Sequence, residues 1–470
     1  MSKTIDAAWE SGPEQLEDRL RGVPDDATLV VDFDETLWLR NSTEAYLASL
    51  RPRFLAAPLL WLLDILKPWR FLGGEAAADW LRVLVATIVF PWTALMWPRR
   101  AAEIGARHAN EALLMLLRQR AGARIVVATQ GFNFIVGPLL DQLALPNHER
   151  RVCRFWRGRA DRLGGKPAML QDVPLEQSVV ITDSEQDAPL LELGALPLLV
   201  KWPEARYERA LAQVYVPLRY AETIKRPGQR YFVHGVVLED WAFWVLATVV
   251  LSASPALHVL GLLFLLVSFW CIYEVGYIEN DRVAELYEKD PVLSDKYHAE
   301  VLPRHWLAPW CWATVVGAIG IALAHPTSWP GTMAVWLAVL LGLRAVYYVY
   351  NHVDKNTRAW LSPLLHAFRS FAAVAIVPVG LAGALALAAH AWCRSTAYLY
   401  YRMVGGKFPQ ASMFLMRLSL FTLLFFAAWL ADMPLNGLEV ILLLSWALFR
   451  ARRELGKVLR GVRRISGDRA

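Results

Sequence analysis

Apolar and polar positions divide the chain into two parts of different character. In the first part, short apolar runs of strand length alternate with stretches of helical pattern, such as residues 101–120 and 133–143. The strand-like runs are residues 29–31, 125–128, 179–182 and 198–200. This alternation predicts a parallel α/β sheet with helices on its faces. We place this domain at residues 27–200, after an N-terminal extension of residues 1–26.

Two strongly apolar segments lie between the first two predicted strands. Residues 54–72 are interrupted by Asp64 and Lys67, and residues 80–97 are interrupted by Arg82. Neither segment therefore has the uninterrupted ~20 apolar residues of a spanning helix. We interpret the insert, at about residues 40–110, as an oily helical cap that lies in the membrane interface. The alternative is a buried helical pair within a soluble domain.

The second part of the chain is dominated by long apolar segments. It begins after residues 201–231, which are charged, punctuated by proline and typical of a linker. The predicted spans are residues 236–253, 256–278, 307–324, 332–350, 413–431 and 434–449, and residues 360–392, which cross twice with a bend near Pro378. The prediction is an all-α polytopic membrane domain at residues 232–450 with about eight helices.

The distribution of charge predicts how this domain is oriented. Basic loops at residues 351–358 and 394–407 and the basic tail at residues 451–470 are expected on the cytoplasmic side. Residues 1–26 are polar and lack the apolar core of a signal peptide. We therefore expect a multi-pass protein of the inner (cytoplasmic) membrane, with the first domain and the C-terminus in the cytoplasm.

Composition supports a membrane protein and argues against two other classes. Hydrophobic residues make up 56% of the chain and include 21 tryptophans, which is too apolar for an ordinary soluble pair of domains. The net charge of +6 gathers at the edges of apolar segments, so it indicates membrane orientation and not nucleic-acid binding. The four cysteines form no CxxC pair, so no disulfide framework or zinc site is expected.

The most informative chemistry is a pair of carboxylates, Asp32 and Asp34, directly after the first predicted strand. Side chains two residues apart on an extended chain share one face, so both point to one side at the end of the sheet. There one carboxylate can attack phosphorus and the other can handle the proton of the leaving group. The spacing indicates phosphoryl transfer.

Phosphoryl transfer of this kind also needs a hydroxyl, a cation and metal ligands at the same edge of the sheet. Thr129 ends the second predicted strand, and Lys166 follows two glycines. Asp183 and Asp187 follow the third predicted strand. The sequence therefore contains all three elements in chain order, each after a predicted strand.

Over residues 27–200 this constellation resembles the haloacid dehalogenase (HAD) superfamily of aspartate-nucleophile phosphatases. The resemblance implies a Rossmann-like α/β domain with a helical cap and a Mg²⁺ cofactor. It implies that Asp32 is the nucleophile and a magnesium ligand. It also implies that Asp34 is the general acid and base, with its backbone carbonyl on the metal.

The same resemblance assigns roles to the later residues. Thr129 would orient the phosphoryl group, Lys166 would stabilise its charge, and Asp183 with Asp187 would hold magnesium. Glu35 departs from the pattern, because the family more often has glycine at this position. The additional negative charge beside the incoming phosphate is expected to slow turnover.

A second candidate site lies at the end of the second predicted span, in residues 273–290. Carboxylates at a membrane helix end can hold magnesium and, through it, a diphosphate. The segment resembles the NDxxDxxxD signature of UbiA-type intramembrane prenyltransferases, except that Ala284 replaces the central aspartate. The candidate residues are Asn280, Asp281, Glu288, Lys225 and Arg226. The alternative interpretation is a polar loop that caps two helices.

Together these patterns support one leading hypothesis and two alternatives. The leading hypothesis is a magnesium-dependent phosphatase of a polyprenyl-type, lipid-linked phosphorylated intermediate, tethered to a UbiA-like domain and bifunctional if that domain transfers a prenyl or phosphoribosyl group. The first alternative is a UbiA-type prenyl or glycosyl transferase with a regulatory HAD domain. The second is a lipid-binding or transport module. The expected partners are the bilayer and an isoprenoid or polyprenyl phosphate; the oligomeric state is left open.

Overall fold

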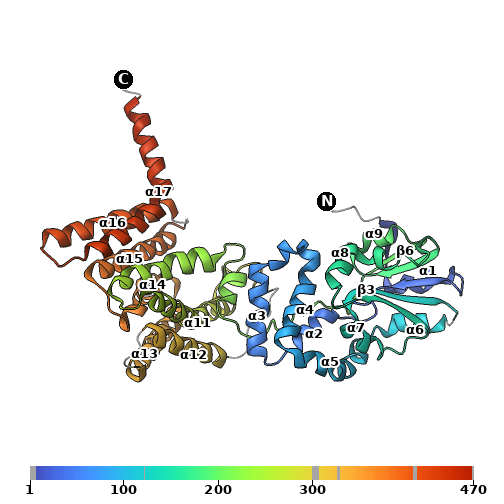
Figure 1. The fold of residues 1–470 in the computed structure, drawn as a ribbon. Helices are drawn as coiled ribbons and strands as arrows, with labels where there is room; N and C mark the ends of the chain where they lie inside the picture. Colours follow the sequence, from blue (N-terminus) through green and yellow to red (C-terminus); the bar gives the residue numbers. More distant parts are fainter. Residues whose placement is uncertain (1–6, 121, 299–305, 325–328, 406–409, 468–470) are drawn as a thin grey trace. The chain divides into compact units, whose positions relative to one another are not determined.

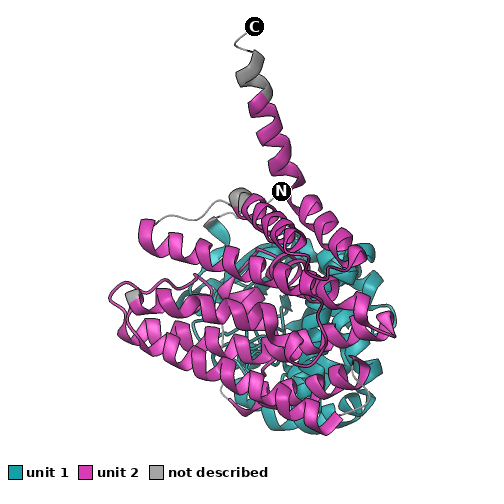
Figure 2. Cartoon of the chain, turned by 90° about the vertical axis from the view of Figure 1, so that its left-hand side faces the viewer, with its two compact units in different colours: residues 1–214 teal, residues 215–470 magenta. Residues whose placement is uncertain are grey.

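The chain folds into two compact units, residues Met1–Val214 (unit 1) and Tyr215–Ala470 (unit 2) (Figure 2). The structure is a computed structural model that describes residues 7–120, 122–298, 306–324, 329–405 and 410–467. The predicted N-terminal extension and basic tail therefore lie partly outside the described residues. Unit 1 contains the predicted sheet, and unit 2 is helical (Figure 1).

In its described residues, unit 1 contains a six-stranded sheet in the order β1-β6-β5-β2-β3-β4. Every neighbouring pair is parallel. The strands are β1 (Glu10–Ser11), β2 (Thr28–Val31), β3 (Arg124–Phe132), β4 (His148–Cys153), β5 (Ser178–Thr182) and β6 (Leu196–Val200). The four predicted strands are confirmed as β2, β3, β5 and β6. Val31, the last residue of β2, pairs with Val127 and Ile181, so the three central strands end at the same edge.

Two strands were not predicted, and both lie at the edges of the sheet. β1 has only two residues and falls within the predicted N-terminal extension, but it pairs with β6 and belongs to the sheet. β4 contains Arg150 and Arg151 and is mostly only partly buried. Neither strand has the continuous apolar run that marks a buried parallel strand.

Helices cover the sheet, and apolar side chains fill the space between them. The helices outside the insert are α1 (Pro13–Arg21), α6 (Glu111–Gln119), α7 (Asn133–Leu140), α8 (Gly158–Met169) and α9 (Ala188–Leu191). One cluster packs Val30, Val126 and Val180 of the central strands against Leu191 of α9. The predicted helix over residues 101–120 is interrupted, because α5 ends at Ile104 before α6 begins.

The insert between β2 and β3 is helical, as expected for a cap. It contains α2 (Ser42–Ala48), α3 (Arg53–Leu66), α4 (Ala78–Val89) and α5 (Pro91–Ile104). α4 and α5 are together apolar enough to cross a membrane, but the chain bends by 107° between them. These helices bury one side and leave large apolar side chains such as Phe54, Leu66 and Leu95 exposed on the other.

Unit 2 is all-helical in the residues that the structure describes. Its helices are α10 (Ala242–Thr248) with the preceding π-helical segment η8 (Phe232–Trp241), α11 (Pro255–Tyr287), α12 (Leu307–Ala324), α13 (Trp329–His352), α14 (Lys355–Phe371), α15 (Leu381–Val404), α16 (Gln410–Leu430) and α17 (Gly437–Gly467). Five described stretches in this unit are long and apolar enough to cross a membrane: Phe232–Leu251, Pro255–Tyr287, Leu307–Ala324, Trp329–His352 and Met413–Leu430.

These candidates support five of the eight predicted crossings, and among the described residues the other three do not meet the same criteria of length and hydropathy. The chain does break between α14 and α15, near Pro378 as predicted. α14 does not qualify as a span because it has only 17 residues. α15 and α17 do not qualify because charged and polar side chains interrupt them. The predicted basic loop at residues 394–407 is also corrected, since α15 continues to Val404 and ends at Gly405, whose φ is 75°.

Candidate active site

Polar side chains gather where the central strands of unit 1 end. Asp32 and Asp34 follow β2, Thr129 lies in β3, and Thr182 is the last residue of β5. Because the three strands are parallel and Val31 at the end of β2 pairs with Val127 and Ile181, these residues meet at the carboxyl edge of the sheet. This is the edge at which open α/β sheets bind their ligands.

Asp32 is buried, with 8% of its surface exposed, and lies between a cation and a hydroxyl. Lys166 Nζ is 2.7 Å from its Oδ1, and the Thr182 hydroxyl is 3.2 Å from its Oδ2. Burial raises the pKa of Asp32 to about 8, while the charge of Lys166 acts in the opposite direction. A buried carboxylate with one strong cationic partner is a candidate nucleophile held in a fixed position.

Lys166 bridges two carboxylates. Its Nζ also lies 2.6 Å from Asp187 Oδ2, and the Thr182 hydroxyl is 2.7 Å from the same oxygen. Burial lowers the pKa of Lys166, but the charges of Asp32 and Asp187 raise it more, so the pKa is above its usual range. The lysine reaches this position because Gly165 breaks α8 with a φ of 73°, a conformation that glycine adopts without strain.

Asp34 is held by the first residue of the cap and by β3. The Ser42 N–H donates to its Oδ1 at 2.5 Å, and the Thr129 hydroxyl donates to its Oδ2 at 3.2 Å. Burial raises the pKa of Asp34 above its ordinary value. A carboxyl group with a raised pKa can carry a proton and release it, as general acid–base catalysis requires.

Asp183 and Glu35 flank this arrangement. The Thr36 hydroxyl donates to Asp183 Oδ1 at 2.8 Å, and the Asp183 N–H donates back to the same hydroxyl at 3.1 Å. Glu35 has a φ of 59°, in the left-handed region that favours glycine. This backbone conformation explains why glycine suits the position, and why a glutamate there is a departure with a conformational cost.

The donor set at this edge fits magnesium. Magnesium prefers one or two carboxylates together with water and phosphate oxygens. The carboxylates of Asp32 and Asp183 and the carbonyl of Asp34 are oxygen donors of this type. Among the described residues, no group of three or more His, Cys, Asp or Glu side chains is arranged to hold a metal ion. Asp187, predicted as a ligand, has its Oδ2 bound by Lys166 and Thr182.

The second predicted site, in unit 2, is brought together only in part. Lys225 Nζ is 2.5 Å from Asp281 Oδ1, and the Tyr220 hydroxyl donates to Oδ2 of the same residue at 2.7 Å. The other predicted residues have different partners. Asn280 donates to Asn351 at 3.1 Å, Glu288 accepts from Arg358 at 2.6 Å, and Arg226 lies over the ring of Tyr231.

Three residues at the first site were not given a role by the sequence. Thr36 holds Asp183, Thr182 contacts Asp32 and Asp187, and Ser42 supplies an amide to Asp34. The sequence could have indicated Thr182, because it is a hydroxyl residue at the end of a predicted strand. Ser42 contributes only its backbone, so no side-chain pattern could indicate it.

Comparison with known families agrees with this geometry. Residues 29–192 match the family described as haloacid dehalogenase-like hydrolase. No curated protein and no solved structure matches the chain. Residues 29–192 thus form a HAD-like hydrolase domain, as the resemblance indicated, and unit 2 is a helical unit with apolar helices. The resemblance of unit 2 to UbiA-type enzymes stays a prediction.

Proposed function

We propose that unit 1 is a magnesium-dependent phosphomonoesterase that uses Asp32 as its nucleophile. The observation that carries this proposal is the position of the Asp32 carboxylate. It is buried beside Lys166, at the same edge of the sheet as an Asp34 carboxyl group that two hydrogen bonds hold in place. The two aspartates have different surroundings, which suits two different roles.

In the proposed reaction, an Asp32 oxygen attacks the phosphorus atom and the bond to the leaving oxygen breaks. Asp34 gives its proton to that oxygen, which leaves as an alcohol. Asp34, now ionised, takes a proton from water, and the water oxygen attacks the aspartyl phosphate. Inorganic phosphate leaves and Asp32 is restored.

The surrounding residues stabilise charge during both steps. The ammonium of Lys166 faces the developing negative charge on the phosphoryl oxygens, and the Thr129 hydroxyl holds Asp34 and orients the phosphoryl group. Asp32, Asp183 and the carbonyl of Asp34 would hold Mg²⁺, which supplies positive charge to the phosphoryl group.

The proposed substrate is a phosphorylated lipid of the polyprenyl type. Two features support it: the described residues include five helical stretches long and apolar enough to cross a membrane, and the cap exposes apolar side chains. The exposed residues on α3 and α5 include Phe54, Leu55, Leu66, Leu95 and Met96. Tethering a phosphatase to the bilayer raises its effective concentration toward such a substrate to about the millimolar range. We place unit 1 and the basic C-terminus on the cytoplasmic side of the inner membrane.

Transfer of a prenyl or phosphoribosyl group by unit 2 remains a second hypothesis. Its most specific support is the Lys225–Asp281 contact, which brings together two residues of the predicted site. Asp281→Ala should abolish magnesium-dependent transfer from a diphosphate donor. A donor turnover unchanged by Asp281→Ala would refute a role for this residue.

The phosphatase proposal is tested with Asp32→Asn in the full-length protein in detergent. Phosphate release from a polyprenyl monophosphate and from p-nitrophenyl phosphate is measured with Mg²⁺. We expect release to be abolished in Asp32→Asn and retained in Asp172→Asn, the same change at a surface carboxylate that is 62% exposed. Undiminished release from Asp32→Asn would overturn the assignment. Equal kcat/KM values for the lipid and the soluble ester would overturn the lipid specificity only.

A further inference from the structure

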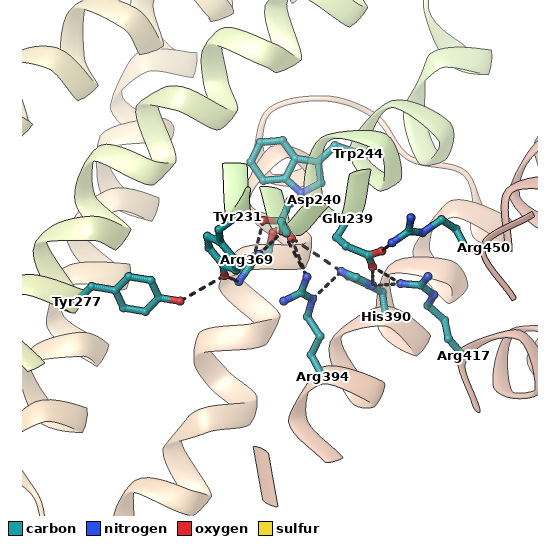
Figure 3. Close-up of polar contacts among 11 residues, drawn as sticks. Tyr231, Glu239, Asp240, Trp244, Tyr277, Arg369, His390, Arg394, Arg417 and Arg450 are labelled. Carbon is teal, nitrogen blue, oxygen red and sulfur yellow. Dashed lines mark hydrogen bonds and ion pairs between the residues drawn. The ribbon is translucent and has the colours of Figure 1, made fainter. Parts of the chain in front are cut away.

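Unit 2 contains a cluster of charged side chains, most of which are buried (Figure 3). Its members are Glu239 and Asp240 of η8, Arg369 of α14, His390 and Arg394 of α15, Arg417 of α16 and Arg450 of α17. None of these residues belongs to the candidate sites described above. Charged groups inside an apolar helical unit are costly unless each has a partner, so their pairing can be examined residue by residue.

The cluster has more guanidinium groups than carboxylates. Glu239 lies between Arg417, at 2.5 Å, and Arg450. Asp240 lies 2.7 Å from Arg369 and 3.9 Å from Arg394. Among the described residues of the cluster, each of two carboxylates is therefore shared by two arginines, and about two positive charges have no negative counterpart.

His390 does not compensate for the excess of guanidinium groups over carboxylates. Its Nδ1 is 3.0 Å from Arg417, and its Nε2 is 3.2 Å from Nε of Arg394. A neutral imidazole has one acceptor nitrogen and one N–H, so it can accept from only one of these two arginines. A protonated imidazole would accept from neither and would add another positive charge.

Several arginine donors in the cluster are buried without an acceptor. They are Nε and Nη2 of Arg417 and Nε of Arg450. Arg417 is 2% exposed, so water does not replace the missing acceptor from outside the unit. Buried donors are nearly always hydrogen-bonded in native proteins, and an unpaired one on a charged group is especially costly.

Elsewhere in unit 2 a partly buried arginine has its own carboxylate. Both terminal nitrogens of Arg344 bind Glu279, at 2.7 and 2.8 Å. Arg344 thus differs from the four arginines of the cluster, which share two carboxylates. A ligand that brings negative charge and several acceptor oxygens would complete the cluster.

We propose that Arg394, Arg417 and Arg450, with His390, form a binding site for a phosphoryl group. A phosphate monoester carries up to two negative charges and three acceptor oxygens, which matches both the charge surplus and the free donors. Guanidinium groups are well suited to phosphate oxygens, because their planar fork presents paired donors. The phosphoryl group belongs either to a phosphorylated lipid or to a soluble phosphate. The site is separate from Asp32 and independent of the function proposed for unit 1.

The test measures equilibrium binding by the full-length protein in detergent with EDTA. A Lys166→Met background removes the cation of the unit 1 site. Two probes are used: labelled inorganic phosphate, and a polyprenyl monophosphate in phosphatidylcholine micelles. Saturable binding of inorganic phosphate identifies a soluble source, and binding of the lipid probe alone identifies a lipid source. Either result supports the site, whereas no binding of either probe overturns it.

Variants locate the binding. Arg417→Gln should weaken it by about 10- to 100-fold, since charge-assisted hydrogen bonds are lost. Arg344→Gln is the matched control and should leave binding unchanged, because Arg344 is already balanced by Glu279. If Arg417→Gln does not fold, Arg394→Gln is used in its place. In that variant Asp240 still has its ion pair with Arg369, so no buried carboxylate loses its last cation. Equal binding by the cluster variant and the control, or equal loss in both, overturns the proposal.

Discussion

Replacing Lys166 with methionine should lower both the phosphatase activity and the stability of unit 1, for two different physical reasons. The ammonium lies 2.7 Å from Asp32 and 2.6 Å from Asp187, with 7% of its side chain exposed. Loss of one preorganised charge at a phosphoryl site should lower kcat by about 10²–10³-fold, or about 2.7–4 kcal/mol. Lys201→Met is the matched control: that lysine also contacts a carboxylate, Glu185 at 2.6 Å, but is 65% exposed.

The stability effect follows from the two carboxylates that the variant leaves behind. Breaking a buried ion pair costs about 3–5 kcal/mol, whereas an exposed pair contributes about 0–1 kcal/mol. For a unit of this size the change in Lys166→Met corresponds to a Tm lower by roughly 6–20 °C. Adding Asp187→Asn removes one stranded carboxylate. The double variant should therefore regain part of the lost stability while staying inactive.

Two measurements separate these effects in the full-length protein. Hydrolysis of p-nitrophenyl phosphate with Mg²⁺ reports activity, and pulse proteolysis with detection of peptides from unit 1 reports unfolding. Lys201→Met should match the wild type in both. The reasoning is refuted if the double variant regains activity together with stability, or if Lys201→Met loses as much as Lys166→Met.

Three further changes test individual contacts in unit 1. Glu35→Gly should raise kcat and stabilise the unit by about 0.5 kcal/mol, because it removes a negative charge and relieves a φ of 59°; a lower kcat would contradict this. Arg82→Met strands the buried carboxylate of Glu44, 2.7 Å away, so limited proteolysis should cut the cap faster than in the wild type, and unchanged rates would count against the contact. Thr129→Val removes the hydroxyl that holds Asp34 and should lower kcat about ten-fold, while a wild-type kcat would show that the contact is dispensable.

The interior of the sheet could be predicted because its strands are buried on both faces. β2, β3 and β5 are apolar runs with turn residues around them. Asp32 follows β2, Asp183 follows β5, and Thr129 lies within β3. The edge strands lack that pattern. β4 places Arg150 and Arg151 on a partly exposed edge, where solvent accepts charge and periodicity gives no signal.

In the candidate active site, the sequence predicts the residues that lie close together in the chain. Asp32 and Asp34 are two residues apart, so alternation along an extended chain already places them together. The contact between Lys166 and Asp187 is not local in this sense. Lys166 precedes Asp187 by 21 residues and reaches it because Gly165 breaks α8. Spacing alone does not predict that Asp187 contacts a lysine.

In unit 2 the long apolar helices were predicted and the charged cluster was not. Its members extend from Glu239 to Arg450, too far apart in the chain for a local pattern to connect them. Arg369 lies in the stretch that the charge of the flanking loops predicted to cross twice, and Arg394 begins a predicted basic loop. In the structure both side chains lie within ion-pair distance of Asp240.

The amide of Ser42 connects the cap to the chemistry of unit 1. This residue begins α2, the first helix of the insert, and its N–H fixes one oxygen of Asp34. A chimera that grafts the cap of another hydrolase onto this sheet must therefore preserve the backbone from Asp34 to Ser42, whatever sequence follows. Grafts joined after residue 42 would inherit an aligned proton donor, while grafts joined before it would have to rebuild that alignment.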